Sequence, residues 1–247
     1  MIKPTSSHAK NYRRTLNDSK NDPRLTTDVF YRNKDPIVKA LTPYLEELDG
    51  QVLEIGSGTG QHLINFAQKF PNITWQGSDL DEIHCKSTDA WAKDQSLNIL
   101  KTLKLDASTD WANTVEHLKE FDLIFSMNVI HIAPISVING FFENANQILK
   151  KGGLTIFYGP FKKGNNYHGE GNKIFDQKLK RENPNWGLRC MNNIIKLAEN
   201  FKYFARTDDY KSQQIPSGLA SKYVKPQVET VSYTHLRAHE TRGNLVC

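Results

Sequence analysis

The sequence predicts an α/β fold, with a mostly parallel sheet and helices on both faces. Three observations predict it: short apolar runs alternate with amphipathic stretches, a glycine-rich loop follows the first apolar run, and an acidic residue closes each of the next two. Strands separated by helices in this rhythm form parallel sheets, because each parallel connection needs a crossover that covers one face. The 247 residues, 38% of them hydrophobic, suffice for one domain of ordinary size.

The individual elements follow from apolar periodicity. Residues 35–48 have apolar positions at helical spacing, and Pro36 suits the first turn of that helix. The expected strands are residues 52–55, 73–78, 99–105, 121–127, 154–158 and 201–206. The expected helices are residues 35–48, 63–70, a segment around Ala90, and residues 111–118, 137–149, 174–181 and 192–201. The pattern loosens in the Gly/Asn-rich residues 159–172, and no periodicity is evident from Thr207 onward.

The first strand runs into a glycine loop, at the carboxyl ends of the strands, where ligands bind in open parallel sheets. Glycines let the main chain turn sharply and approach a ligand closely. A dinucleotide loop, G-x-G-x-x-G, would have glycine where Gln61 stands. The observed G-x-G-x-G spacing is instead typical of class I methyltransferases, which bind S-adenosylmethionine (SAM). The residues expected to contact SAM here are Glu54, Gly56, Ser57, Gly58, Thr59 and Gly60.

Acidic residues end the second and third expected strands. Asp79 stands 19 residues after Gly60, in the range where an acid accepts hydrogen bonds from ribose hydroxyls. A helix cap is the alternative role for such a carboxylate, and Asp81 suits that role better. Asp106 stands where folds of this class contact the adenine amino group. The SAM contacts expected at these strand ends are Asp79, Leu80, Asp106 and Ala107.

Further motifs resemble those of one class I methyltransferase family, long without an assigned function, whose animal member is methyltransferase-like protein 26. The resemblance covers roughly residues 22–201. It rests on Y-R-N-K-D-P (31–36), L-E-I-G-S-G-T-G-Q-H (53–62), W-Q-G-S-D-L-D (75–81), N-V-I-H-I-A-P (128–134), Y-G-P-F (158–161), N-K-I-F-D (172–176) and W-G-L-R (186–189). It implies that Arg32 and Asn33 precede the first helix and close over SAM. Cys190 departs from the family, which usually has an acid there.

The residues after the fourth strand are the candidates for chemistry, because the acceptor meets the methyl group there in this fold class. Asn128 is expected to contact SAM. His131 is the candidate general base, since the ordinary pKa of histidine lies near neutrality; a histidine that bonds the neighbouring loop is the alternative. No [DN]-P-P-[YFW] stands there, which argues against methylation of exocyclic amino groups on DNA. The candidate acceptor contacts are Tyr158, Asn172 and Arg189, with a structural ion pair as the alternative for Arg189.

Composition restricts the partners. The net charge is +5, and residues 1–24 hold six Lys or Arg against two acids, which predicts a mobile basic leader; contact with RNA is its alternative role. Three widely spaced cysteines predict unpaired thiols and no metal site. No apolar run is long enough for a membrane span or a secretion signal, so we expect a cytoplasmic protein without membrane contact.

The expected organisation is a SAM-binding domain over residues 25–206 and an incomplete strand region over 207–230. Residues 231–247 look like translated sequencing-adapter read-through, in which case the last native strand is missing and a sheet edge is exposed. The sequence thus predicts methyl transfer from SAM to a small-molecule acceptor. A SAM-binding regulatory module without transfer activity, an RNA or protein methyltransferase that uses the leader, and an NAD-dependent dehydrogenase are the alternatives.

Overall fold

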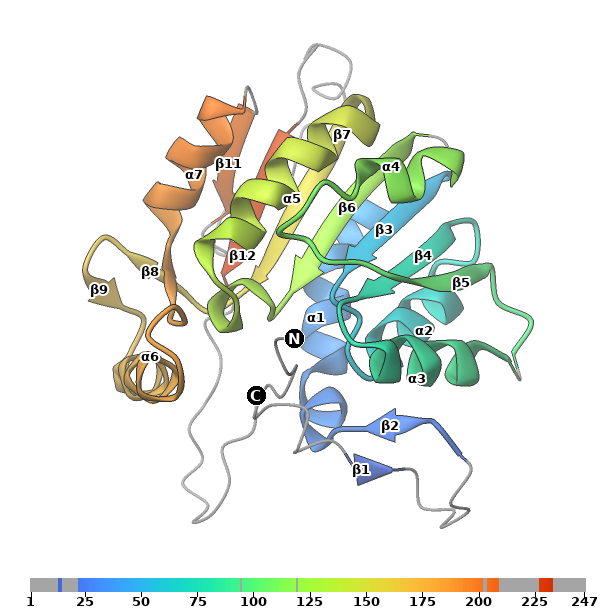
Figure 1. Ribbon diagram of the computed structural model, residues 1–247, viewed down its shortest axis with the longest axis horizontal. Coiled ribbons are helices and arrows are strands. Elements are labelled where there is room, and N and C mark those ends of the chain that lie inside the picture. Colours follow the sequence, from blue (N-terminus) through green and yellow to red (C-terminus); the bar gives the residue numbers. More distant parts are fainter. Residues whose placement is uncertain are drawn as a thin grey trace. The chain divides into compact units, whose positions relative to one another are not determined.

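The apolar runs and amphipathic stretches become alternating strands and helices, as Figure 1 shows. The computed structural model describes residues 13–14, 22–93, 95–118, 120–201, 204–208 and 227–232. These residues fall into two compact units, one up to Leu105 and the other from Asp106 onward.

In the first unit, parallel strands are connected by helices. The elements are β1 (Arg13–Arg14), β2 (Leu25–Thr26), α1 (Asp28–Leu45), β3 (Gln51–Ile55), α2 (Gln61–Lys69), β4 (Thr74–Asp79), α3 (Glu82–Lys93) and β5 (Ile99–Lys104). β4 pairs in parallel with β3 and β5, and β1 pairs antiparallel with β2. Both α2 and α3 pack on β4, while α1 packs on α2. The loop between β3 and α2 is the predicted glycine loop.

The core of this unit lies directly beneath that loop. Leu53, Leu63, Phe66 and Trp75 are fully buried, and the ring of Phe66 stacks on that of Trp75 at 5.7 Å between centroids. Each such side chain contributes roughly 1.5–3 kcal/mol of burial free energy. Close packing of β4 against α2 gives the loop a rigid base.

The second unit contains a parallel sheet and a smaller one. Its elements are α4 (Ala112–Val115), a 3₁₀ turn η2 (Glu116–Leu118), β6 (Phe121–Met127), a 3₁₀ turn η3 (Ile130–Ile132), α5 (Ile135–Ile148), β7 (Leu149–Gly159), β8 (Phe161–Lys163), β9 (Asn166–Tyr167), α6 (Glu170–Glu182), β10 (Arg189–Cys190), α7 (Met191–Asn200), β11 (Phe204–Asp208) and β12 (Gln227–Ser232). The order β6-β7-β12-β11 is parallel throughout. In the smaller sheet β8 lies between β10 and β9. The predicted α/β architecture, with a mostly parallel sheet and helices on both faces, is confirmed.

The predicted start of the first helix is wrong. Helix α1 begins at Asp28, and the hydroxyl of its N-cap Thr27 accepts a hydrogen bond from the Val29 N–H at 3.3 Å. Arg32 and Asn33 therefore lie inside the helix instead of ahead of it, and so does Pro36. An internal proline removes one main-chain donor, but the cap and the burial of the apolar stripe of α1 maintain the helix on both sides of it.

Two regions without periodicity nevertheless form strands. The hairpin β8–β9 lies in the Gly/Asn-rich stretch 159–172, and β12 follows the long segment after β11. β8 and β9, of three and two residues, are too short to show an alternation, and pairing with a neighbouring strand decides them. Residues 1–12, 15–21 and 233–247 lie outside the described residues, so the predicted leader and read-through tail stay predictions.

Within the part of the chain that the structure describes, no helix combines the length and apolar character that crossing a membrane requires. Nor do three or more His, Cys, Asp or Glu side chains gather there in a way that would hold a metal ion.

A half-buried histidine with a buried Nδ1 lies at the start of α2. The His62 ring is 4.9 Å from that of Phe30 and 6.3 Å from that of Phe66. Its Nδ1 has no hydrogen-bond partner among the described residues, and burial lowers the pKa of His62 to about 4. The neutral ring is therefore the form that the fold accommodates.

We predict that acid destabilises the protein through His62. As the pH falls from 6.5 toward 4, the unfolded chain binds a proton at this position that the folded protein does not, so stability present above pH 6.5 is lost. Between about pH 7 and about pH 4.5, the wild type should lose more free energy of unfolding than His62→Phe does, by up to about 3 kcal/mol. Urea unfolding at the two pH values measures this difference. His168→Gln, at an exposed histidine, should behave as the wild type. Equal acid sensitivity in wild type and His62→Phe would contradict the prediction.

Candidate functional site

The glycine loop is shaped by its own main chain. The N–H groups of Gly56 and Ser57 both donate to the Ser78 carbonyl at 2.9 Å, which anchors the loop to the end of β4. Gly56, Gly58 and Gly60 have φ values of 84°, 56° and 83°. These values lie in the left-handed region that glycine adopts without steric cost. The three glycines of the motif are thus a conformational requirement.

A second set of contacts ties the loop to α3. A Cβ on Gly60 would lie 2.6 Å from Thr88 Cα, so the helix approaches too closely for any side chain there. The buried Ser87 hydroxyl donates to the Thr59 carbonyl at 2.8 Å and accepts from the Leu25 N–H at 2.8 Å. The loop is therefore held from α3 and from the segment ahead of α1 at once.

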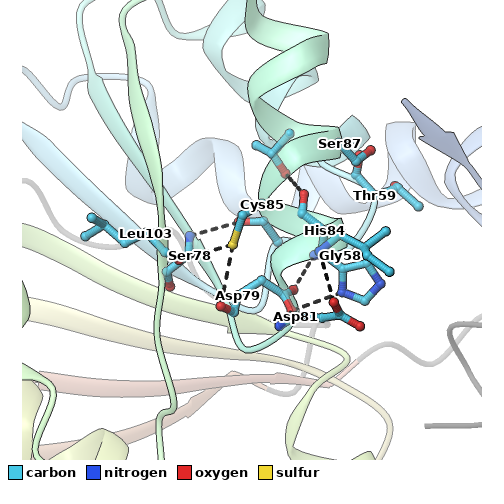
Figure 2. Close-up of polar contacts among 12 residues, drawn as sticks. Gly58, Thr59, Ser78, Asp79, Asp81, His84, Cys85, Ser87 and Leu103 are labelled. Carbon is cyan, nitrogen blue, oxygen red and sulfur yellow. Dashed lines mark hydrogen bonds and ion pairs between the residues drawn. The ribbon is translucent and has the colours of Figure 1, made fainter. Parts of the chain in front are cut away.

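Asp79 ends β4, as predicted, and Figure 2 shows its carboxylate among donors from the loop and from α3. Its Oδ2 accepts from the Gly58 N–H at 2.8 Å. Its Oδ1 accepts from the Asp81 N–H at 2.9 Å and lies 3.0 Å from Nδ1 of His84. Asp81 caps α3, because its Oδ1 accepts from the Ile83 N–H at 2.9 Å. The capping role thus falls to Asp81, and Asp79 faces the glycine loop.

Sequence reasoning missed His84. Burial alone would lower the pKa of this histidine, but the hydrogen bond with Asp79 and the charges of Asp79 and Asp81 raise it. Its position in the first turn of α3 is the signal that could have found it, because the turn after β4 brings that helix back beside the strand end. His84 orients the Asp79 carboxylate.

A thiol completes the group drawn in Figure 2. The Cys85 Sγ–H donates to the Asp79 carbonyl at 3.6 Å and lies 3.5 Å from that of Leu103. Burial first, and then the charge of Asp79, raise the pKa of Cys85 to about 11. It is an unpaired thiol, as predicted, and it stays protonated at neutral pH.

Glu54 is a buried carboxyl in β3, directly before the loop. It is 1% exposed, and its Oε2 has no hydrogen-bond partner within the described ranges. Burial raises the pKa of Glu54 to about 8, against a hydrogen bond from Ser57 that lowers it, and the Asp79 charge raises it further. Glu54 is therefore mainly protonated at neutral pH, and a cation at the loop would favour its ionised form.

Apolar side chains extend from the same segment. Leu80 follows Asp79 and is 56% exposed, and Ile83 is 60% exposed. Exposed aliphatic surface next to a polar anchor suits a flat, partly apolar ligand. Arg32 is exposed and Asn33 half-buried on α1. Their contact with SAM stays a prediction.

In the second unit, Asp106 organises the turn after β5. Its Oδ1 accepts from the N–H and the hydroxyl of Ser108, at 2.9 and 2.6 Å. Ala107 is buried, and a Cβ on Gly140 would lie 2.2 Å from its carbonyl oxygen. Helix α5 therefore packs directly on this turn. Contact of Asp106 and Ala107 with adenine stays a prediction.

The ends of β6 and β7 bring the acceptor-side candidates together. Asn128 has a φ of 58°, uncommon for a residue other than glycine, and its N–H donates to the Tyr158 carbonyl at 2.9 Å. The position of a Cβ on Gly159 would lie 3.5 Å from Asn128 Oδ1 and 3.6 Å from His131 Nδ1. The Asn128 and His131 side chains thus lie together beside the buried Gly159.

His131 is almost completely enclosed, at 2% exposed. Its ring meets the Phe175 ring edge-on at 5.5 Å, and its carbonyl accepts from the Gly187 N–H at 2.9 Å. The turn η3 that carries it is therefore held by α6 and by the W-G-L-R motif.

Arg189 clamps the same turn. Its Nε donates to the Ile130 carbonyl at 2.9 Å, and its Nη2 donates to the carbonyls of Ala133 and Asn185. Burial lowers the pKa of Arg189, partly offset by the charge of Asp176. Main-chain carbonyls are thus its hydrogen-bond partners, and acceptor binding by Arg189 stays a prediction. Acceptor binding by Tyr158, buried at the end of β7, and by Asn172, half-buried in α6, also stays a prediction.

Asp176 is the other functional residue that sequence reasoning missed, although it lies in the N-K-I-F-D motif. It is fully buried, and its Oδ1 accepts from the Leu188 N–H at 2.6 Å. Its Oδ2 accepts from the Tyr167 hydroxyl and from Lys180 Nζ, both at 2.6 Å. Burial alone would raise the pKa of Asp176, but these hydrogen bonds hold it below its ordinary value. Asp176 therefore joins α6, β9 and the W-G-L-R motif as an ionised carboxylate.

A family model described as "Protein of unknown function (DUF938)" matches residues 26–209. The chain belongs to this family. The match includes the glycine loop, Asp79, the turn with His131 and the segment with Asp176 and Arg189.

Solved structures with a similar fold are methyltransferases. An O-methyltransferase family protein from Burkholderia thailandensis is 15% identical with a TM-score of 0.55, over 72% of this chain and 55% of that one. Human N-acetylserotonin methyltransferase, solved with SAM, is 15% identical with a TM-score of 0.54, over 72% and 48%. A Haemonchus contortus N-methyltransferase, solved with phosphomonomethylethanolamine and S-adenosylhomocysteine, is 18% identical with a TM-score of 0.52, over 69% and 37%. This chain thus spans about half or less of their length, and the likeness confirms the Rossmann-like class I methyltransferase fold.

We predict that Arg189→Met loosens the turn that carries His131. Carbonyls of Ile130 and Ala133 would lose a charged donor, so the free energy of unfolding should fall by about 2–3 kcal/mol. Amide exchange at Gly187 should accelerate, since its N–H bonds the His131 carbonyl. Arg181→Met is the matched control, because Arg181 is exposed and its Nε reaches one carbonyl at 3.3 Å. Equal effects of the two substitutions in urea unfolding and hydrogen exchange would contradict a clamp.

Proposed function

We propose that this chain is a SAM-dependent methyltransferase with a small-molecule acceptor, and that within its family it is a relative of methyltransferase-like protein 26. The observation that carries the proposal is the ionisable carboxylate of Asp79 held against the Gly58 N–H of a G-x-G-x-G loop. Such a loop lets a ligand approach the main chain, and the carboxylate beside it accepts from vicinal hydroxyls. Similar folds solved with SAM and S-adenosylhomocysteine support the same ligand.

The residues present suit the parts of SAM. The glycine loop meets its amino-acid part, Asp79 accepts from the ribose hydroxyls, and Leu80 offers aliphatic surface to adenine. Asp106 and Ala107 serve the adenine amino group and ring. Glu54, buried and without a partner on Oε2 among the described residues, favours a cationic ligand, because a nearby positive charge offsets the desolvation cost of ionising its carboxyl.

SAM supplies a methyl group on a sulfonium, and the protein has to hold the acceptor in line with it. Positioning provides most of the rate in such a reaction. Asn128 and His131 lie beside Gly159, and their side chains offer polar atoms to an acceptor hydroxyl or amine. His131 is the group that takes its proton.

The enclosure of His131, at 2% exposed, favours one alternative: a SAM-binding regulatory module without transfer activity. The RNA methyltransferase alternative depends on the basic leader, of which only Arg13–Arg14 and residues 22–24 are among the described residues.

We predict that Asp79→Asn weakens SAM binding about 10- to 100-fold, since an amide replaces one acceptor oxygen by a donor. Isothermal titration calorimetry with SAM, S-adenosylhomocysteine and NAD measures it. Asp81→Asn is the control, because asparagine caps helices as well and the same charge is removed two residues away. Its affinity should stay near that of the wild type. NAD binding more tightly than SAM would replace the proposal by a dehydrogenase.

Transfer requires a separate measurement. S-adenosylhomocysteine formation from SAM should increase when a low-molecular-mass metabolite fraction is added. His131→Gln, which keeps a polar side chain of similar size, should slow it by about 10²- to 10⁴-fold without changing SAM affinity. An unchanged rate would exclude His131 as the base. SAM binding without any turnover in either protein would favour the regulatory module.

A further inference from the structure

The small sheet β10-β8-β9 and helix α6 gather positive charge around one buried carboxylate. Lys180 Nζ lies 2.6 Å and Lys162 Nζ 3.8 Å from the same Oδ2 of Asp176, which also accepts from the Tyr167 hydroxyl. Two ammonium groups thus face one carboxylate. These four residues, Lys162, Tyr167, Asp176 and Lys180, form what we call the basic cluster.

Acidic neighbours on α6 do not cancel this excess. Glu170 lies 3.2 Å from Lys173, one turn along the helix, and Glu182 lies 4.0 Å from Lys178. Each acid therefore has a lysine of its own on the same helix. Arg189, on the strand beside β8, adds a further positive charge, which the charge of Asp176 stabilises.

The two lysines are not equivalent. Lys180 makes a short hydrogen bond, and its side chain is 48% exposed. The Lys162 side chain is only 19% exposed, yet its Nζ lies beyond hydrogen-bond distance of Asp176. The Tyr167 ring, 5.5 Å from Nζ, stabilises the cation in part. Lys162 makes no closer polar contact among the described residues, so this largely desolvated ammonium gains from a second anion.

The basic cluster adjoins the turn of His131 within the same unit. Phe175, which packs on the His131 ring, and Asp176 are consecutive on α6. Lys162 follows Gly159, which lies beside His131 and Asn128, by three positions, a span of at most about 10 Å of extended chain. The main chain of the basic cluster therefore lies within about the length of a small molecule from that turn.

We propose that the basic cluster binds, through Lys162, an anionic group of the acceptor, either a carboxylate or a phosphate. The assignment to the acceptor rests on the proposed methyl transfer, whereas anion binding itself is a property of the cluster. Lys180 neutralises Asp176, to which the Tyr167 hydroxyl also donates, so that this carboxylate does not repel the incoming anion.

The test uses the full chain and simple anions. Thermal unfolding midpoints are measured against inorganic phosphate and, separately, acetate, with chloride keeping the ionic strength constant. At least one of them should raise the midpoint of the wild type above its value in chloride, because a ligand of the folded state stabilises it. A larger effect of phosphate indicates a phosphate-bearing acceptor, and a larger effect of acetate indicates a carboxylate.

Lys162→Met should weaken this anion response at least about tenfold in concentration, the usual scale for loss of one charged hydrogen bond. Lys163→Met is the control, since it removes the same charge from the exposed neighbouring position. It should respond as the wild type. Lys162→Arg keeps the positive charge and should keep the rise of the unfolding midpoint with the anion. This variant provides the comparison if Lys162→Met does not fold.

An equal response of Lys162→Met and the wild type, or no response of the wild type beyond chloride, would overturn the proposal. Lys162 would then be a structural partner of Asp176. SAM calorimetry on the wild type separates this failure from that of the proposed function. If SAM binds but no anion stabilises the protein, anion binding by the basic cluster is rejected and the proposed function stands. If an anion stabilises the protein but SAM does not bind, only the assignment of that anion to a methyl acceptor is rejected.

Discussion

The hydrogen bond from the Gly58 N–H to the Asp79 carboxylate is the interaction on which the candidate SAM site depends. It joins the end of β4 to the loop after β3, and it places a charged acceptor where the loop leaves main chain uncovered. The loop can adopt this course only because its glycines tolerate positive φ and because α3 approaches Gly60 closely. His84 and the Asp81 N–H fix the other carboxylate oxygen. The acid is thereby oriented before any ligand arrives, which lowers the entropy cost of binding.

The second unit uses a buried carboxylate in a different way. The Asp176 carboxylate accepts a hydrogen bond from the Leu188 N–H, and the neighbouring Gly187 N–H donates to the His131 carbonyl. Arg189 donates to the carbonyls of Ile130 and Ala133 in the same turn. The W-G-L-R motif thus fastens a turn through its main chain and the Arg189 side chain. A buried carboxylate whose hydrogen bonds are all made fixes the geometry of its partners, and the loss of one partner destabilises the fold strongly. The same carboxylate lies beyond hydrogen-bond distance of Lys162 Nζ. The ammonium group of Lys162 is therefore available to the anion that we propose.

Burial changes the protonation of two ionisable groups next to the glycine loop. Glu54 and His62 lie on either side of the glycine loop, and burial moves the pKa of Glu54 upward and that of His62 downward. Both groups are therefore mainly neutral near pH 7 in the free protein, although an exposed glutamate would be ionised. A cationic ligand is thus met by a carboxyl group that can become charged in response.

The sequence by itself determined the alternation of strands and helices, the glycine loop and the acid at the end of β4, because these depend on local periodicity and on residue types at fixed spacing. The start of α1 predicted from Pro36 is wrong, because Thr27 caps the helix at Asp28. Only the tertiary structure decided that His84 orients Asp79, that Arg189 grips carbonyls, and that Lys162 and Lys180 share Asp176. Arg189 and Lys162 meet partners that are distant along the chain, whereas the contacts of His84 and Lys180 are local and depend on the turn after β4 and on α6. Burial, which sets the strength of all of them, is a property of the packed molecule.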